Sequence, residues 1–137
     1  MTSDGLIVCV SKFGPKETMD RLASAITTRG MSIMARIDHA AAAATIGMEL
    51  RPTEVLVFGN PRAGTPLMQA VQTVGIDLPL KAPVWQDEGG KTWLAYNDPR
   101  WLAHRQATTP GWIRPFPPWP MPSPRLRRKQ RSGSAEV

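Results

Sequence analysis

The segment Gly-Asn-Pro-Arg-Ala-Gly-Thr-Pro at residues 59–66 is the strongest candidate for a ligand site in this sequence. It follows an apolar run and leads into a predicted helix, with Thr65 as its cap and Pro66 as its first residue. The free amides of such a helix start can hold an anion, and Arg62 lies nearby. The Gly-Lys-Ser/Thr ending of a Walker loop is absent, and a turn that needs these residues only for its geometry is the simpler interpretation. Any ligand site is expected here, at Asn60, Arg62, Gly64 and Thr65.

A second polar turn, Asn97-Asp98-Pro99, ends the last predicted strand. If that strand ends beside residues 54–58, Asn97 and Asp98 line the same site. An Asx turn explains both side chains without any ligand.

The sequence contains no recognisable catalytic or metal-binding pattern. His39 and His104 are the only imidazoles, and no third ligand stands at a metal-like spacing, so neither a metal nor a cofactor is expected. Cys9 lies in an apolar run, where a buried small hydrophobe is favoured over a reactive thiol. Whether the chain is an enzyme stays open, with residues 59–66 acting together with Asp98 or His39 as the catalytic alternative.

The periodicity of apolar residues predicts the elements that would position these groups. Strands are predicted at 6–10, 32–38, 53–58, 80–86 and 91–96, and helices from Pro15 to Gly30, His39 to Gly47, Thr65 to Gly75 and Pro99 to His104. This order indicates an α+β fold, a two-layer sandwich of a mostly antiparallel sheet with helices on one face.

Three details of these elements are more specific expectations. The strand at 32–38 should be half-buried, with Ile33, Ala35 and Ile37 on one face. Pro83 lacks an amide donor, which suggests that its strand lies at an edge or contains a bulge. Consecutive glycines at 89–90 predict a hairpin that pairs Trp85 with Trp93.

The net charge of +6 in 137 residues belongs to the end of the chain. Residues 1–105 carry eleven Lys or Arg against ten Asp or Glu, whereas residues 106–137 carry six against one. Half of the fourteen prolines also fall after residue 105. We therefore expect a folded body at 5–105 and a largely unstructured tail at 106–137, which either evolved as a tail or arose from a frameshift near Gln106.

Linked motifs along the body resemble the bacterial and archaeal family of domains of unknown function 302 (DUF302). They run from Thr53-Glu54-Val55-Leu56-Val57-Phe58-Gly59-Asn60-Pro61 through Ala63-Gly64-Thr65-Pro66-Leu67-Met68 to Thr92-Trp93-Leu94-Ala95-Tyr96-Asn97-Asp98-Pro99. The resemblance covers about residues 5–105. It implies a small α+β domain that forms dimers and has no agreed activity.

Three functional classes follow from these observations. The first is a non-enzymatic domain that binds a small ligand or a protein partner, as a homodimer, and the second is an enzyme of unknown reaction. The third is weak nucleic-acid association through the basic tail residues, Arg125, Arg127, Arg128, Lys129 and Arg131. No apolar run approaches the length that crosses a bilayer, so we expect a cytoplasmic protein without membrane contact.

Overall fold

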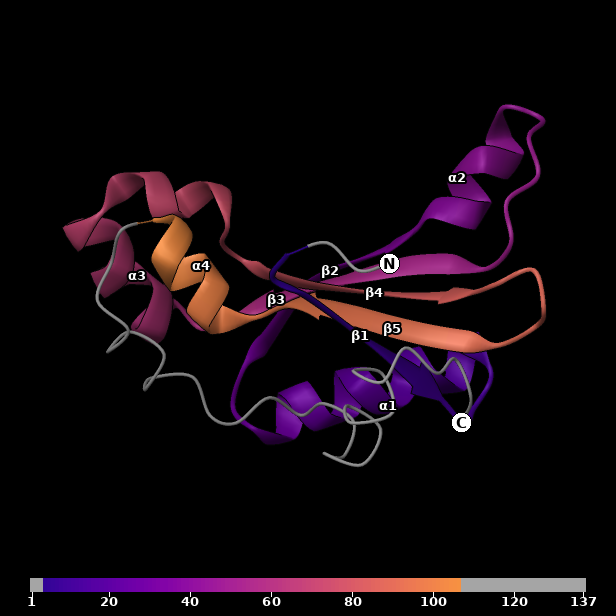
Figure 1. The fold of residues 1–137 in the computed structure, drawn as a ribbon, viewed down its shortest axis with the longest axis horizontal. Coiled ribbons are helices and arrows are strands. Elements are labelled where there is room, and N and C mark those ends of the chain that lie inside the picture. Colours follow the sequence, from indigo (N-terminus) through magenta and orange to yellow (C-terminus); the bar gives the residue numbers. More distant parts are fainter. Residues whose placement is uncertain (1–3, 107–137) are drawn as a thin grey trace.

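The structure, a computed structural model, describes residues 4–106, which form one antiparallel sheet with helices around it. Figure 1 shows this arrangement. The elements in chain order are β1 (Leu6–Ser11), α1 (Pro15–Thr28), β2 (Ser32–Asp38), α2 (His39–Thr45), β3 (Thr53–Gly59), α3 (Pro61–Ala70), the 3₁₀ helix η1 (Gln72–Ile76), β4 (Leu80–Gln86), β5 (Thr92–Asn97) and α4 (Pro99–Arg105). The predicted α+β class and the antiparallel sheet are confirmed.

The order of the strands, β1-β5-β4-β3-β2, decides which loops share an end of the sheet. Every neighbouring pair is antiparallel, so β3 and β5 run in the same direction on either side of β4. Their last residues, together with the first residue of β4, form what we call the α3 end of the sheet. The opposite end, where the β4–β5 turn and α2 lie, we call the hairpin end (Figure 1).

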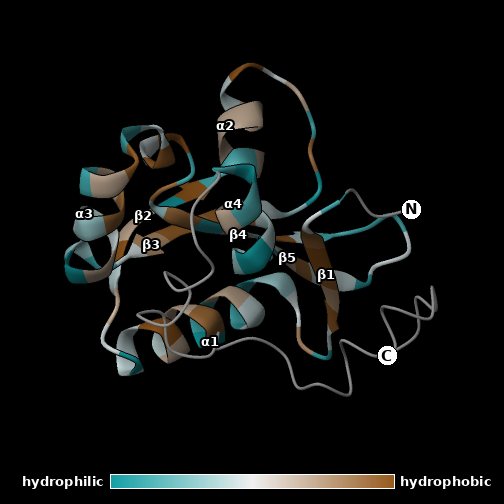
Figure 2. Ribbon diagram, turned by 60° about the vertical axis from the view of Figure 1, so that its left-hand side comes forward, coloured by the Kyte–Doolittle hydropathy of each residue, from teal (hydrophilic) through white to brown (hydrophobic). Residues whose placement is uncertain are grey.

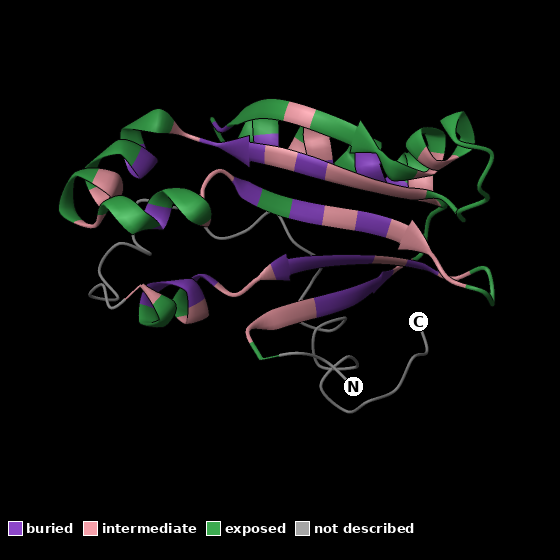
Figure 3. Ribbon diagram, turned by 90° about the horizontal axis from the view of Figure 1, so that it is seen from above, coloured by how far each residue is buried: buried purple, intermediate pink, exposed green. Residues whose placement is uncertain are grey.

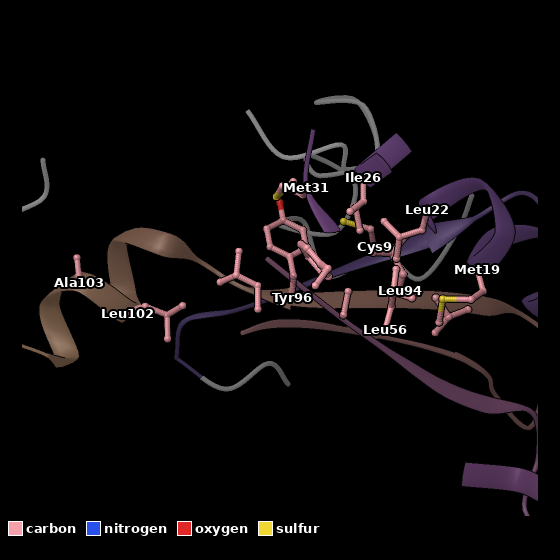
Figure 4. Packing of buried hydrophobic residues seen from close by; sticks show 14 residues of the cluster. Cys9, Met19, Leu22, Ile26, Met31, Leu56, Leu94, Tyr96, Leu102 and Ala103 are labelled. Atoms are coloured by element: carbon pink, nitrogen blue, oxygen red, sulfur yellow. The ribbon is translucent and has the colours of Figure 1, made fainter. Parts of the chain in front are cut away.

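The hydrophobic core lies between α1 and one face of the sheet. Helix α1 buries Thr18, Met19, Leu22 and Ile26, at the spacing of one helical face. Alternate residues of the strands meet this face, because successive side chains of a strand point to opposite sides of its sheet. Figure 4 shows how these side chains pack, and the fully buried ones include Cys9, Leu56, Phe58, Val84 and Tyr96.

The expectation of a half-buried strand at residues 32–38 is wrong, although the strand itself is confirmed. β2 lies at the edge of the sheet and only Ala35 is even partly buried, as the exposed upper strand in Figure 3 shows. A bulge between Ile33 and Ala35 shifts the register, so Ile33 no longer shares a face with Ile37. Alternation in the sequence cannot reveal such a bulge.

The expectation that Pro83 marks an edge strand or a bulge is also wrong. β4 lies inside the sheet, with a continuous register to β3 through Pro83. Its pairing with β5 begins only at Val84. The missing amide donor of Pro83 therefore falls beyond the paired part of the β4–β5 ladder, where it disrupts no hydrogen bond.

The helix expected to begin at Pro66, with Thr65 as its cap, begins five residues earlier, at Pro61. Asn60 is the N-cap of α3 and its Oδ1 accepts from the amide of Arg62 at 3.0 Å, while Pro61 occupies the first turn. Pro66 consequently lies inside the helix rather than at its start. Asn60-Pro61 satisfies the same preference for a polar cap followed by proline that Thr65-Pro66 does, and the earlier pair initiates the helix.

The last described residues are tied to the body by side-chain contacts. Asp77 accepts from Arg105 Nη1 at 2.7 Å and from the side-chain amide of Gln106, which also accepts from Thr73. Folding of residues 5–105 on their own stays a prediction. The expectation of an unstructured tail falls on residues outside the described range.

Candidate ligand pocket

A small apolar pocket opens at the α3 end of the sheet. Its cavity volume is about 310 Å³, at the lower limit of the usual range for small-molecule sites. Helix α3 forms one wall of the pocket. The end of β3, the bulged start of β2 and residues 78–80 at the start of β4 form the others. The ten lining residues are Met34, Gly59, Asn60, Pro61, Gly64, Thr65, Met68, Leu78, Pro79 and Leu80.

Two glycines keep the pocket open. A Cβ on Gly64 would lie 3.5 Å from Leu78 Cδ1 and 3.9 Å from Met68 Cε, and one on Gly59 would lie 3.7 Å from Met34 Cε. These are ordinary contact distances, and neither glycine has the positive φ that would exclude a side chain. Glycine at these two positions therefore supplies space rather than an unusual backbone conformation.

Asn60 and Thr65 add polar groups to this apolar lining. The Oδ1 atom of Asn60 is occupied by the cap of α3, but its amide nitrogen donates to none of the described residues. The Thr65 hydroxyl likewise has no partner within residues 4–106. Both groups are thus available to one polar atom of a ligand whose remaining surface is apolar.

The structure gathers part of the predicted site and leaves the rest outside. Asn60, Gly64 and Thr65 line the pocket, whereas the exposed Arg62 does not. Asn97 and Asp98 lie at the same end of the sheet, two strands from Asn60, but do not reach the lining. Asp98 instead caps α4, accepting from the amide of Arg100 at 2.9 Å.

Sequence reasoning missed the apolar half of the pocket, above all Met34 and the segment 78–80. Methionine is the flexible, polarisable side chain that adapts to irregular apolar ligands. Nothing in the sequence indicates that Met34 and Met68, thirty-four residues apart, line one pocket, because only the bulge of β2 brings Met34 opposite α3.

Asn60 and Asp98 provide a matched pair of variants, since each caps a helix and only Asn60 lines the pocket. We expect Asn60→Ala and Asp98→Ala each to lower the free energy of unfolding by about 1 kcal/mol, the usual cost of a lost N-cap. Only Asn60→Ala should also weaken binding of an apolar ligand. Urea titrations and ligand titrations of both variants check this, and equal binding losses would remove Asn60 from the site.

The remaining sequence candidates do not converge on this pocket. His39 begins α2 at the hairpin end, the opposite end of the sheet from residues 59–66. Cys9 is fully buried in β1, as expected of a small core hydrophobe. Residues 4–106 contain no group of three His, Cys, Asp or Glu side chains placed to hold a metal ion.

An antiparallel five-stranded sheet with one long helix against it and an apolar pocket at one end defines a small α+β domain. Residues 7–113 match the family described as Domain of unknown function DUF302, and the chain belongs to that family. The fold agrees with a crystal structure of an uncharacterized conserved DUF302 protein from Bacillus stearothermophilus, with a TM-score of 0.71 at 20% identity over 82% of this chain and 87% of that one.

Longer relatives carry a similar segment. A Brucella suis protein named Fluoride-specific ion channel FluC 1 is 46% identical over 103 residues, which are 75% of this chain and 41% of that protein. The Brucella abortus protein of the same name and the Brucella melitensis protein FluC 2 match equally, over 38% of their length. The chain therefore spans about two-fifths of these relatives. Within residues 4–106, no helix combines the length and the apolar character that crossing a bilayer requires.

Proposed function

We propose that this chain is a non-enzymatic binding domain whose pocket at the α3 end holds a small apolar molecule with one polar end. The carrying observation is the pocket itself, with Met34, Met68 and Leu78 around space that Gly59 and Gly64 leave free. None of its ten lining side chains is titratable, which favours binding over acid–base catalysis there. A cytoplasmic location is part of the same proposal.

Gly64 gives this proposal its sharpest test, because stability and binding should move in opposite directions. Gly64→Ala places a methyl group in the pocket at normal contact distance and improves the helix propensity of α3. We expect the free energy of unfolding to rise by about 0.5–1 kcal/mol. Binding of phenylnaphthylamine, an apolar fluorescent dye, should weaken several-fold, and Gly64→Leu should abolish it.

Gly89→Ala is the control for this series, since Gly89 lies in the hairpin turn, outside the pocket and without a positive φ. Its dye binding should equal that of the unchanged protein. Dye affinity that stays constant in a folded Gly64→Leu variant would refute the pocket as the binding site. Native mass spectrometry of the purified chain would in addition show any copurified ligand.

A second candidate function, self-association, rests on the exposed apolar surface around α2. Ile37, Ile46, Met48 and Leu50 are 44–71% exposed, and α2 buries none of its residues (Figure 2 shows it projecting from the sheet). A seven-residue helix that packs only through partly buried alanines against β3 is marginal in water, which favours a further partner surface for this segment. We propose a second copy of the chain, because β2 is an edge strand and antiparallel pairing of two such edges is self-complementary.

Light scattering at high micromolar concentration tests the dimer. Met48 is 63% exposed, so Met48→Lys should leave the monomer folded while it separates the two copies. A monomeric unchanged protein would contradict the proposal. The tail residues considered for nucleic-acid binding, Arg125, Arg127, Arg128, Lys129 and Arg131, lie outside the described range.

A further inference from the structure

The apolar pocket at the α3 end has a buried side and an exposed side. Gly59, Gly64 and Leu80 are buried, whereas Pro61 and Thr65 are exposed. An apolar group gains most where it is removed from water completely, and a polar group of the same molecule loses least where it stays partly hydrated. A bound molecule therefore places its apolar body against Gly59, Gly64 and Leu80 and its polar end toward Thr65.

Helix α3 arranges its lining residues in the same order. Pro61, Gly64, Thr65 and Met68 follow each other at the spacing of one helical face. The two polar side chains of the lining, Thr65 and the cap Asn60, belong to the first half of the helix. The half-buried Met68 comes almost a full turn later, so the polarity of the pocket falls along the helix.

The polar atoms that Asn60 and Thr65 can offer a ligand are hydrogen-bond donors. As the N-cap, Asn60 turns its Oδ1 toward the amide of Arg62 at 3.0 Å, which leaves the Nδ2 group, a donor that cannot accept. The Thr65 hydroxyl, which has no partner within residues 4–106, can donate as well. Granted the binding role proposed above, we propose that the polar end of the ligand is a hydrogen-bond acceptor, the oxygen of a carbonyl or carboxylate group.

The charges around the pocket exclude an ammonium group as the polar end. Within residues 4–106 no carboxylate lines the pocket, and the nearest one along the chain, Asp77, is paired with Arg105 at 2.7 Å. Arg62 is exposed beside the cap, and Lys81 donates its Nζ to the carbonyl of the lining residue Pro79 at 3.1 Å. Together with the positive end of the helix dipole of α3, these cations favour an acceptor oxygen and repel an amine.

Four naphthalenes with the same apolar body test the polar end. 2-Acetylnaphthalene carries a carbonyl, 2-naphthoate a carboxylate and 2-naphthylmethylamine an ammonium group, while 2-isopropenylnaphthalene has the shape of the ketone without its oxygen. Displacement of phenylnaphthylamine from the full chain measures the affinity of each. We expect the better of the two oxygen ligands to bind about tenfold or more tighter than the amine. Tighter binding of the ketone identifies a neutral carbonyl compound as the ligand, and tighter binding of naphthoate identifies a carboxylate.

Two conservative variants assign the donors. Thr65→Val keeps the shape of the side chain and removes the hydroxyl, and Asn60→Ser keeps an oxygen for the cap while it removes Nδ2. Each should lower the affinity of the better oxygen ligand about fivefold relative to that of 2-isopropenylnaphthalene, which cannot accept a hydrogen bond. Thr28→Val is the matched control, because Thr28 is an exposed threonine at the end of α1, outside the pocket. It should leave this ratio unchanged.

The same titrations separate failure of this inference from failure of the proposed function. If the dye binds and Gly64→Leu abolishes its binding, but the amine binds as tightly as the oxygen ligands, the pocket stands and the acceptor assignment is overturned. Ratios that Thr65→Val and Asn60→Ser both leave at the level of Thr28→Val would overturn it in the same way. If neither the dye nor any naphthalene binds, the binding role and the ligand class fall together.

Discussion

Gly5→Ala should be among the most damaging single substitutions in this domain. Gly5 has a φ of +79°, and a Cβ at this position would lie 2.2 Å from the ring of Trp101. An L residue in this backbone region costs about 1–2 kcal/mol, and the overlap adds about 1–3 kcal/mol through repacking. The backbone of Gly5 also holds α4, since its carbonyl accepts from the amide of Asp98 at 2.7 Å. We therefore expect a loss of about 3 kcal/mol or more.

Gly30→Ala separates the cost of the backbone conformation from the cost of the overlap with Trp101. Gly30 follows α1 with a φ of +82° and has no atom within 4 Å of the position of a new Cβ. It should lose only about 1–2 kcal/mol, the backbone cost alone. Urea denaturation of both variants measures the difference, and equal losses would show that Trp101 does not pack against Gly5.

Phe58→Ala should destabilise the protein by about 3–5 kcal/mol, as removal of a fully buried aromatic side chain usually does. Phe58 is 0% exposed and belongs to the core beneath α1. The preceding residue, Val57, points to the other face of β3 and is only partly buried. Val57→Ala should cost about 1 kcal/mol at low protein concentration.

Comparison of these two neighbours tests which face of the sheet carries the core. If Val57→Ala were as costly as Phe58→Ala in the monomer, the packing described for α1 would be contradicted. Denaturation at two protein concentrations separates destabilisation of the monomer from loss of a partner on the second face. Only the stabilising free energy that a partner contributes depends on protein concentration.

Much of the fold could be predicted because local patterns and tertiary contacts agree. Residues 55–58 of β3 are all apolar, α1 begins at a proline and is followed by a glycine, and Asp38 caps α2 by accepting from the amide of Ala41. The predictions failed where contacts between residues far apart in the sequence determine the structure. Nothing local in the sequence shows that the β4–β5 pairing begins only after Pro83, or that β2 bulges beside Met34.

The pocket residues divide in the same way, into those that local patterns predict and those that only long-range geometry places. Asn60, Gly64 and Thr65 could be selected because a strand–turn–helix junction is a common place for ligands, and all three line the cavity. Proximity in the sequence predicts Arg62 at the same site, and the expected end of the sheet predicts Asn97 and Asp98 there. Arg62 is exposed and Asp98 caps α4, and none of the three lines the pocket.

The most direct test of a ligand site between β2 and α3 is NMR of the chain with ¹³C-labelled methionine methyl groups, titrated with phenylnaphthylamine. Met34 and Met68 line the pocket, Met19 is fully buried in the core, and Met48 is 63% exposed near the hairpin end. We expect saturable shifts of the Met34 and Met68 methyls with one common affinity, while the Met19 and Met48 methyls stay unchanged. Shifts confined to Met48, or no saturable shift at Met34 and Met68, would contradict the assignment of this pocket as the binding site.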